Sequence, residues 1–212
     1  SATATTDGGY LLFGQSHSNA NGDRSEGSRG GWDYWGVKVD ENGSKVWDKR
    51  FGGSSNDYCR SIVATSDGGY LLAGYSTSGA SGDRSEPSRG DRDYWAVKID
   101  ANGTKVWDKR FGSSGEDYLF RVIATAEAGY LFAGRSESGA TGDKSEASRG
   151  GFDFWTGRFL PPSDRSNLDG PFYLNTYQFP IAQAYPALEN GRDNGVAIMQ
   201  EYNGGQFKWS YG

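Results

Sequence analysis

The stretch DGGYLL at residues 7–12 decides the fold of this chain. It returns as DGGYLL at residues 67–72 and as EAGYLF at residues 127–132, each time after an interval of 60 residues. An acidic residue and glycine followed by an apolar run is typical of a tight turn that leads into a strand. The sequence therefore predicts one turn-and-strand unit repeated every 60 residues.

The repeat extends well beyond this stretch. Residues 1–60 align with residues 61–120 without a gap at 40 identical positions, a density that indicates internal duplication. The third copy continues to residue 159 and breaks at the Leu-Pro-Pro that follows, and residues 160–212 carry five of the six prolines of the chain. We expect a repeat domain over residues 1–159, with copies at 1–60, 61–120 and 121–159, and a divergent last blade or capping segment of the same domain over 160–212.

Each complete repeat predicts four short strands. In the second repeat they are expected at residues 70–76, 93–100, 105–111 and about 118–125. The Asn-Gly pair at residues 102–103, like that at 42–43, predicts a tight two-residue hairpin turn, because both central residues must accept a positive φ. Tryptophans 35, 95 and 155 fall inside strands and are expected in the core.

Short antiparallel strands in groups of four are typical of β-propeller blades. Residues 1–7 match residues 61–67, so the chain is expected to begin inside a fourth strand, and residues 196–212 resemble the second strand, hairpin and third strand of a repeat. Residues 161–195 would supply the rest of a last blade, with 172–179 as its clearest strand.

The expected fold is therefore an all-β, β-propeller-like array of four-stranded antiparallel blades. A small four-bladed ring closed by the N-terminal strand would leave no open sheet edge. A fragment of a larger propeller, or an open array in which the tail is a cap, are the alternatives.

Composition and charge exclude several classes of protein. The 212 residues carry a formal net charge of −5, so no basic excess favours nucleic acid as a partner. No apolar run approaches the ~20 residues that a membrane span requires. Cys59 and His17 are the only residues of their kinds, which excludes an internal disulfide and multi-histidine metal sites. Ser1 is not a translation start, so the chain is expected to be processed or part of something longer.

The turn-strand at residues 67–74, the DYW strand at 93–100 and the Asn-Gly hairpin that leads to Trp107 resemble a known group of proteins. They are similar to bacterial secreted and cell-surface repeat proteins whose DGGY-type units are taken to build β-propellers. The resemblance implies export, residence outside the cell, and binding or scaffolding in place of catalysis. It defines no functional residues that could be carried over to this chain.

The long loop of each repeat carries the first candidate site. Its acidic residues lie among serine and glycine, and hard oxygen ligands of this kind suit calcium. A basic residue beside each aspartate would repel a cation, however, so pairing of acids with bases is the competing interpretation. The candidate metal ligands are Asp23, Glu26, Asp83, Glu86, Asp143 and Glu146, and no other cofactor is expected.

The junction between each long loop and the next strand carries the second candidate site. Trp32 stands there in the first repeat, and an exposed aromatic beside an aspartate could stack on a sugar ring. Packing of the loop is the competing interpretation. The candidate ligand-binding residues are Trp32, Asp33, Arg92, Asp93, Phe152 and Asp153.

Repetition suits multivalent binding better than catalysis, which needs one asymmetric site. We expect a non-catalytic, secreted or cell-surface binding or scaffold module whose partner is a glycan or a surface protein. A structural subunit of a surface assembly or filament, with self-association, is the alternative. A glycoside hydrolase that uses carboxylates such as Asp23, Glu26 and Asp33 is a third hypothesis.

Overall fold

The computed structural model describes residues 1–125, 129–161, 175–179, 197–202 and 206–211. The chain divides into two units, Ser1–Phe179 and Pro180–Gly212. Within the described ranges every regular element is a β-strand, and none of them contains a helix that is long and apolar enough to cross a membrane. The all-β expectation is confirmed.

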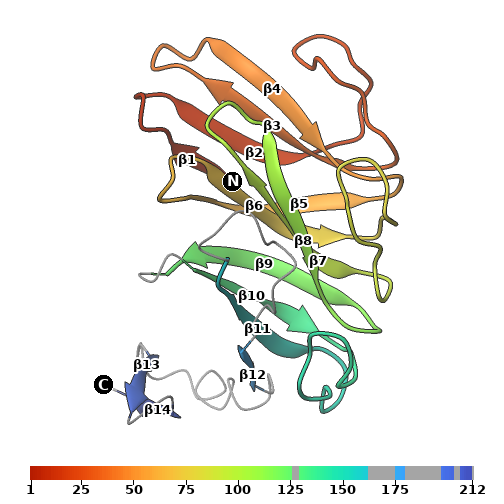
Figure 1. The fold of residues 1–212 in the computed structure, drawn as a ribbon, viewed down its shortest axis with the longest axis vertical. Helices are drawn as coiled ribbons and strands as arrows, with labels where there is room; N and C mark the ends of the chain where they lie inside the picture. The colour runs from red at the N-terminus through yellow and green to blue at the C-terminus, as the bar shows by residue number, and fades with distance from the viewer. Residues whose placement is uncertain (126–128, 162–174, 180–196, 203–205, 212) are drawn as a thin grey trace, which may run out of the picture. The chain divides into compact units, whose positions relative to one another are not determined.

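The first unit consists of three four-stranded sheets in which all neighbouring strands are antiparallel (Figure 1). The first sheet contains β1 (Ala2–Ala4), β2 (Tyr10–Ser16), β3 (Asp33–Val39) and β4 (Lys45–Phe51). The second contains β5 (Asp57–Ala64), β6 (Tyr70–Ser76), β7 (Asp93–Ile99) and β8 (Lys105–Phe111). The third contains β9 (Asp117–Ala124), β10 (Tyr130–Ser136), β11 (Asp153–Phe159) and β12 (Asn175–Phe179). The second unit contains one antiparallel pair, β13 (Ala197–Tyr202) and β14 (Gln206–Tyr211).

The predicted strands are present, but they are grouped differently from the expectation. The strand expected at about 118–125 is β9, which pairs with β10 of the third sheet and not with the strands before it. Likewise, β1 pairs with β2 in the first sheet. The sequence had suggested that this N-terminal strand would instead complete the last blade and close the ring. The physical reason is the turn at residues 5–9, closed by a hydrogen bond from Thr5 N–H to the carbonyl oxygen of Gly9. This short turn makes β1 and β2 adjacent strands of one hairpin.

The fourth strand of the third sheet corrects a second expectation. Sequence places residues 172–179 in a separate last blade, whereas β12 pairs with β11 and completes the third sheet. Phe179 lies opposite Phe154 in the same register as Phe111 opposite Tyr94 in the second sheet. Residues 160–174 separate β11 from β12, whereas five residues connect β3 to β4 and β7 to β8. Because of this longer connection, the equivalence of β12 to β4 and β8 was not evident from the sequence.

The Asn-Gly hairpins are confirmed, with a connection longer than two residues. Strand β7 ends at Ile99 and β8 begins at Lys105. Asp100 N–H donates to the carbonyl oxygen of Thr104, and the Asp100 carboxylate accepts hydrogen bonds from the N–H groups of Asn102 and Thr104. Gly103 has a φ of 80°, which favours glycine at this position. The aspartate before the Asn-Gly pair therefore widens the turn and satisfies its N–H groups.

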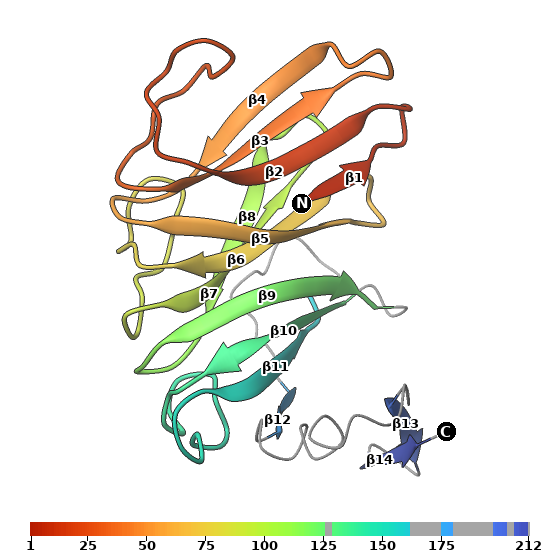
Figure 2. The ribbon, with the colours of Figure 1, turned by 180° about the vertical axis from the view of Figure 1, so that it is seen from behind.

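The core lies between successive sheets, which follow one another in chain order (Figure 2). The outgoing face of each sheet is defined as the face toward the next sheet in the chain, and the incoming face as the face toward the preceding one. Trp95 of the second sheet is fully buried against the outgoing face of the first, and Trp155 is buried in the same way against the second. Trp35 is only partly buried, because no sheet covers its face among the described residues of the first unit.

Tyrosine hydroxyls fix the sheets to one another. Tyr34 Oη donates to the carbonyl oxygen of Trp95 at 3.0 Å, and Tyr94 Oη donates to that of Trp155 at the same distance. Cys59 lies in the core between the first two sheets, and burial raises the pKa of its thiol to about 12. It is therefore an unreactive core residue.

Candidate functional site

The long loops are held together from inside by a basic side chain. Arg24 is buried, and its guanidinium donates to Ser16 Oγ and to the carbonyl oxygen of Ser18, both at 2.7 Å. Lys144 occupies the equivalent place in the third sheet and donates to Ser136 Oγ at 2.9 Å and to Ser148 Oγ at 2.7 Å. The serine oxygens that could have served as calcium ligands are thus already used by a cation of the protein.

Five of the six acidic candidate residues pair with basic residues, four of them with bases from other segments. Asp83 forms an ion pair with Arg29 of the preceding loop, and Asp143 lies 2.6 Å from the Nη1 atom of Arg89. Glu86 Oε1 lies 2.8 Å from Lys109 Nζ. Glu26 lies 3.5 Å from Arg50, and Glu146 lies 3.8 Å from Arg149.

Within the part of the chain that the structure describes, no three or more His, Cys, Asp or Glu side chains are grouped so as to hold a metal ion. The geometry therefore favours ion pairing for these loops. Of the six candidate ligands, Asp23 is the one that is exposed and forms no ion pair with a described residue.

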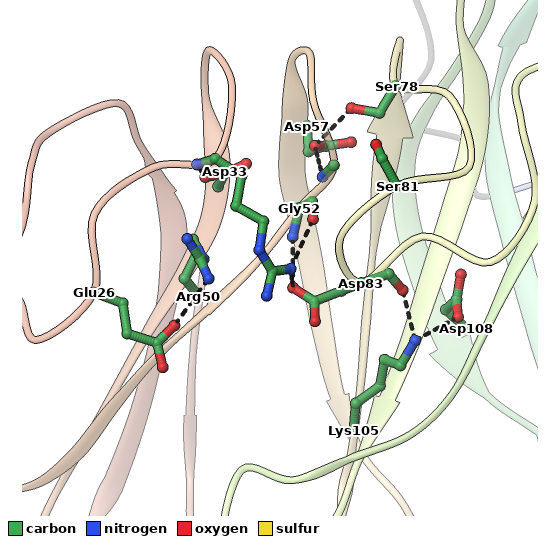
Figure 3. A network of polar contacts seen from close by, with 12 residues as sticks. Glu26, Asp33, Arg50, Gly52, Asp57, Ser78, Ser81, Asp83, Lys105 and Asp108 are labelled. Atoms are coloured by element: carbon green, nitrogen blue, oxygen red, sulfur yellow. Dashed lines mark hydrogen bonds and ion pairs between the residues drawn. The ribbon is translucent and has the colours of Figure 1, made fainter.

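One contact joins each long loop to the next sheet, and we call it the inter-sheet clasp. It comprises Arg29, Gly52 and Asp83 at the first junction, and Figure 3 labels Gly52 and Asp83. Asp83 N–H donates to the carbonyl oxygen of Gly52 at 3.0 Å, while Gly52 N–H donates to the Asp83 carboxylate at 3.1 Å. The Arg29 guanidinium donates to both partners.

The same clasp recurs at the second junction, where Arg89, Gly112 and Asp143 make the equivalent contacts. Glycine is required at its centre, since a Cβ at Gly112 would overlap the carboxylate of Asp93.

The aspartates beside the loop-to-strand junctions are buried. Asp33 and Asp93 are 0% exposed and Asp153 is 6% exposed. Each carboxylate accepts a hydrogen bond from the N–H of an arginine four residues earlier in its own loop, at 2.6 to 2.7 Å. These aspartates order the loop from below. Their carboxylates are buried and do not form part of the exposed surface of the loop.

Burial also changes how these carboxylates titrate. Desolvation raises the pKa of Asp93 from 3.8 to about 6, although the hydrogen bond from the Arg89 N–H opposes the rise. The folded protein therefore holds more protons at this site than the unfolded chain between pH 4 and 6, so its contribution to stability falls as the pH rises through that window.

We expect Asp93→Asn to make the free energy of unfolding less dependent on pH between pH 4 and 6, because the amide keeps the acceptor but does not titrate. Urea denaturation at several pH values measures this slope. Asp7→Asn is the control, because hydrogen bonds from Lys38 and Thr5 lower the pKa of Asp7 to about 2, outside the window. A slope unchanged by Asp93→Asn would contradict the assignment.

The second set of candidate residues lies where each long loop reaches the first strand of the next sheet. Asp57 N–H donates to the carbonyl oxygen of Trp32 at 2.5 Å, and Asp117 N–H donates to that of Arg92 at 2.7 Å. Trp32 packs edge-on against His17 at 4.4 Å between ring centroids. These positions are equivalent, but their side chains differ in each repeat.

Two of these candidates meet at one ring that sequence reasoning missed. The Arg92 guanidinium lies 5.1 Å from the ring centroid of Tyr118, and the Phe152 ring lies 5.6 Å from it. Arg135 lies 4.7 Å from the same ring and 4.2 Å from that of Phe152. Three side chains from two sheets therefore gather around Tyr118.

The ring contacts continue into the second sheet. Tyr75 lies 4.9 Å from Tyr118, and Tyr58 lies 5.0 Å from Tyr75. The exposed Arg60 covers both of the latter rings and donates to Tyr75 Oη at 2.7 Å. We call this set the aromatic–arginine row, which consists of Tyr58, Arg60, Tyr75, Arg92, Tyr118, Arg135 and Phe152.

Most of the row lies where the repeats differ, and Tyr58 and Tyr118 are the unchanged pair within it. Gln15, Tyr75 and Arg135 are equivalent, as are Trp32, Arg92 and Phe152, while most of the surrounding sequence repeats unchanged. In a duplicated chain, an unchanged part maintains the fold and a changed part is free to become specific. Comparing the repeats for their differences points to Tyr75, Arg92, Arg135 and Phe152, but not to Tyr118, which has the identical Tyr58 as its equivalent.

Neither the family models nor the curated proteins that were compared with this chain give a match.

Proposed function

We propose that this chain is a non-catalytic binding module of β-propeller-like architecture, and that it binds an anionic glycan through the aromatic–arginine row. The observation that carries the proposal is the set of three guanidinium groups, those of Arg60, Arg92 and Arg135, stacked on the rings of the row. Glu116 lies beside the row and forms an ion pair with Arg92. The row is therefore basic on a chain whose formal net charge is −5.

This chemistry suits a sugar that carries carboxylate or sulfate groups. Aromatic rings stack on the apolar faces of sugars, and a guanidinium binds two oxygens of a carboxylate or sulfate through two parallel hydrogen bonds. A ring already in contact with its arginine loses little side-chain entropy when the ligand arrives. From the resemblance of the repeats to secreted DGGY-type proteins we expect a location outside the cell, where such glycans are present.

Arg135→Gln tests the proposal with little risk to the fold, because glutamine is the residue that the first repeat has at this position. We expect affinity for uronate-containing or sulfated oligosaccharides to fall about tenfold or more, from the loss of a charge-assisted hydrogen bond. A glycan array followed by calorimetry on the best ligand measures the change.

The charge-matched control is Lys45→Gln, which removes an exposed positive charge on β4, outside the row, and should leave the affinity unchanged. Equal losses in both variants would show that net charge, and not the row, determines binding. Folded protein that binds no anionic glycan would overturn the proposal.

A further inference from the structure

A β-bulge in the first strand of the second and third sheets places one extra residue at the aromatic–arginine row. The pairing of β5 with β6 skips Arg60, and the pairing of β9 with β10 skips Phe120. A bulge leaves its extra residue without a cross-strand partner and changes the direction of its side chain. The Arg60 guanidinium lies 5.2 Å from the ring centroid of Tyr75, and the Arg135 guanidinium lies 5.8 Å from that of Phe120. Each bulge residue therefore meets a side chain of the second strand of its sheet.

The two sheets exchange the basic and the aromatic member of this pair. In the second sheet the bulge supplies Arg60 and β6 supplies Tyr75, whose hydroxyl accepts a hydrogen bond from Arg60 Nη2 at 2.7 Å. In the third sheet the bulge supplies Phe120 and β10 supplies Arg135. Because phenylalanine has no hydroxyl, the exchange removes the acceptor that the second sheet offers to its arginine.

Arg135 has no polar partner among the described residues. Its guanidinium lies on the rings of Tyr118, Phe120 and Phe152, and these ring contacts are accompanied by no hydrogen bond or ion pair within the described ranges. Its Nε is buried without a hydrogen-bond partner. Arg135 is therefore a cation held by aromatic rings and left without a counter-charge.

The acid beside the row is already engaged by other groups. Glu116 Oε1 pairs with Arg92, and Glu116 Oε2 accepts a hydrogen bond from Tyr118 Oη at 2.9 Å. Arg92 thus has a carboxylate and Arg60 has the Tyr75 hydroxyl, whereas Arg135 has neither. Of the three arginines of the row, Arg135 is the one whose charge is open to a ligand.

The surroundings of Arg135 are open on one side. Phe120 is 50% exposed, and Arg135 itself is partly exposed. Of the Arg135 nitrogen atoms, only Nε is both fully buried and unpaired, so the two unpaired Nη groups reach the surface. Two such groups match two oxygens of a carboxylate or sulfate, and the Phe120 ring gives an apolar surface beside them.

We propose that Arg135 binds one anionic group of the glycan, a carboxylate or a sulfate, through its two Nη groups, and that the sugar ring carrying this group contacts Phe120. This inference rests on the proposed function and assigns its charge recognition to one residue. Arg60 and Arg92 maintain the row through Tyr75 and Glu116. The ligand class is therefore a glycan that is recognised through a single anionic sugar.

Matched small probes test this assignment. Methyl glucuronide and methyl glucoside differ by one carboxylate, and the corresponding sulfate ester distinguishes a sulfate from a carboxylate ligand. We expect methyl glucuronide or the sulfate ester to bind about tenfold more tightly than methyl glucoside, and Arg135→Gln to remove this preference. NMR titration that follows the arginine side-chain resonances measures both affinities and identifies the arginine that responds. Lys45→Gln, outside the row, should keep the preference.

An exchange variant removes the site without changing the net charge. Phe120→Arg combined with Arg135→Tyr gives the third sheet the bulge pair that the second sheet already has. The new tyrosine hydroxyl is expected to accept a hydrogen bond from the new guanidinium, so the preference for the anionic probe should fall about tenfold. A folded exchange variant that keeps the preference would contradict the assignment.

The remaining outcomes separate this inference from the proposed function. If wild-type protein bound charged and neutral probes equally, or if Arg60→Gln removed the preference as completely as Arg135→Gln, recognition by Arg135 alone would be overturned. Binding of anionic oligosaccharides in that case would leave the proposed function standing. If the small probes bound at Arg135 but no oligosaccharide was bound, the anion site would be supported and the proposed function would fail.

Discussion

Trp95→Ala is expected to lower the free energy of unfolding by about 3–5 kcal/mol, the range for removing a large buried aromatic residue. The Trp95 ring is fully buried between the first two sheets, 4.9 Å from Tyr34. Its Nε1 donates to the carboxylate of Asp108 at 3.1 Å, and this acceptor would lose a donor. The cavity would open in the interface between the first two sheets, so the substitution weakens the contact that holds these sheets together.

Trp35→Ala is the matched control, because Trp35 has the equivalent position in the first repeat and follows the same Asp-Tyr pair. It faces a side of the first sheet that no other described sheet covers, so we expect a loss of about 1–2 kcal/mol. Chemical denaturation of both variants measures the difference. Equal losses would show that the first sheet is covered and would contradict the assigned stacking.

Gly36→Ala carries the second large expected effect. Gly36 lies directly opposite Phe13 in neighbouring strands, and a Cβ at Gly36 would overlap the Phe13 ring. Because this ring is buried in the core between the first two sheets, it has little freedom to move away. We expect a loss of about 1–3 kcal/mol from overpacking. Phe13→Ala alone should cost about 3–5 kcal/mol, by leaving a cavity.

The second repeat suggests how the two changes compensate each other. There the equivalent pair is Ala73 opposite Ala96. The double variant Phe13→Ala with Gly36→Ala gives the first sheet this pair, and we expect its loss to be smaller than the sum of the single losses by about 1 kcal/mol or more. Strict additivity in denaturation experiments would show that the two positions do not share a packing space.

The local elements could be read from the sequence. Alternation of apolar residues predicts β6, β7 and β8, and the expected ranges agree with the strands to within a residue. The grouping of strands into sheets could not be read in the same way. Strand β9 pairs with β10 and not with β8, although five residues separate it from each of these strands, so connection length along the chain does not decide the pairing.

The candidate site was predicted only in part. Arg92 and Phe152 were identified as positions that differ between repeats, but Tyr118 and Arg135, which bring them together, were not. These contacts join residues from different sheets, and no spacing along the chain predicts which rings meet across such a junction. The buried state of Asp93 was also not predicted, because an aspartate beside a glycine-rich loop is indistinguishable by sequence from an exposed one.

The sequence by itself determined the repeat, its strands and its turns, since these depend on local alternation and on glycine at positive φ. Only the tertiary structure decided which faces are covered. Tyr10 and Tyr70 have the same neighbours in the chain, yet one is 52% exposed and the other 4%. Burial depends on whether another sheet packs against that face, and this property belongs to the stack and not to the repeat.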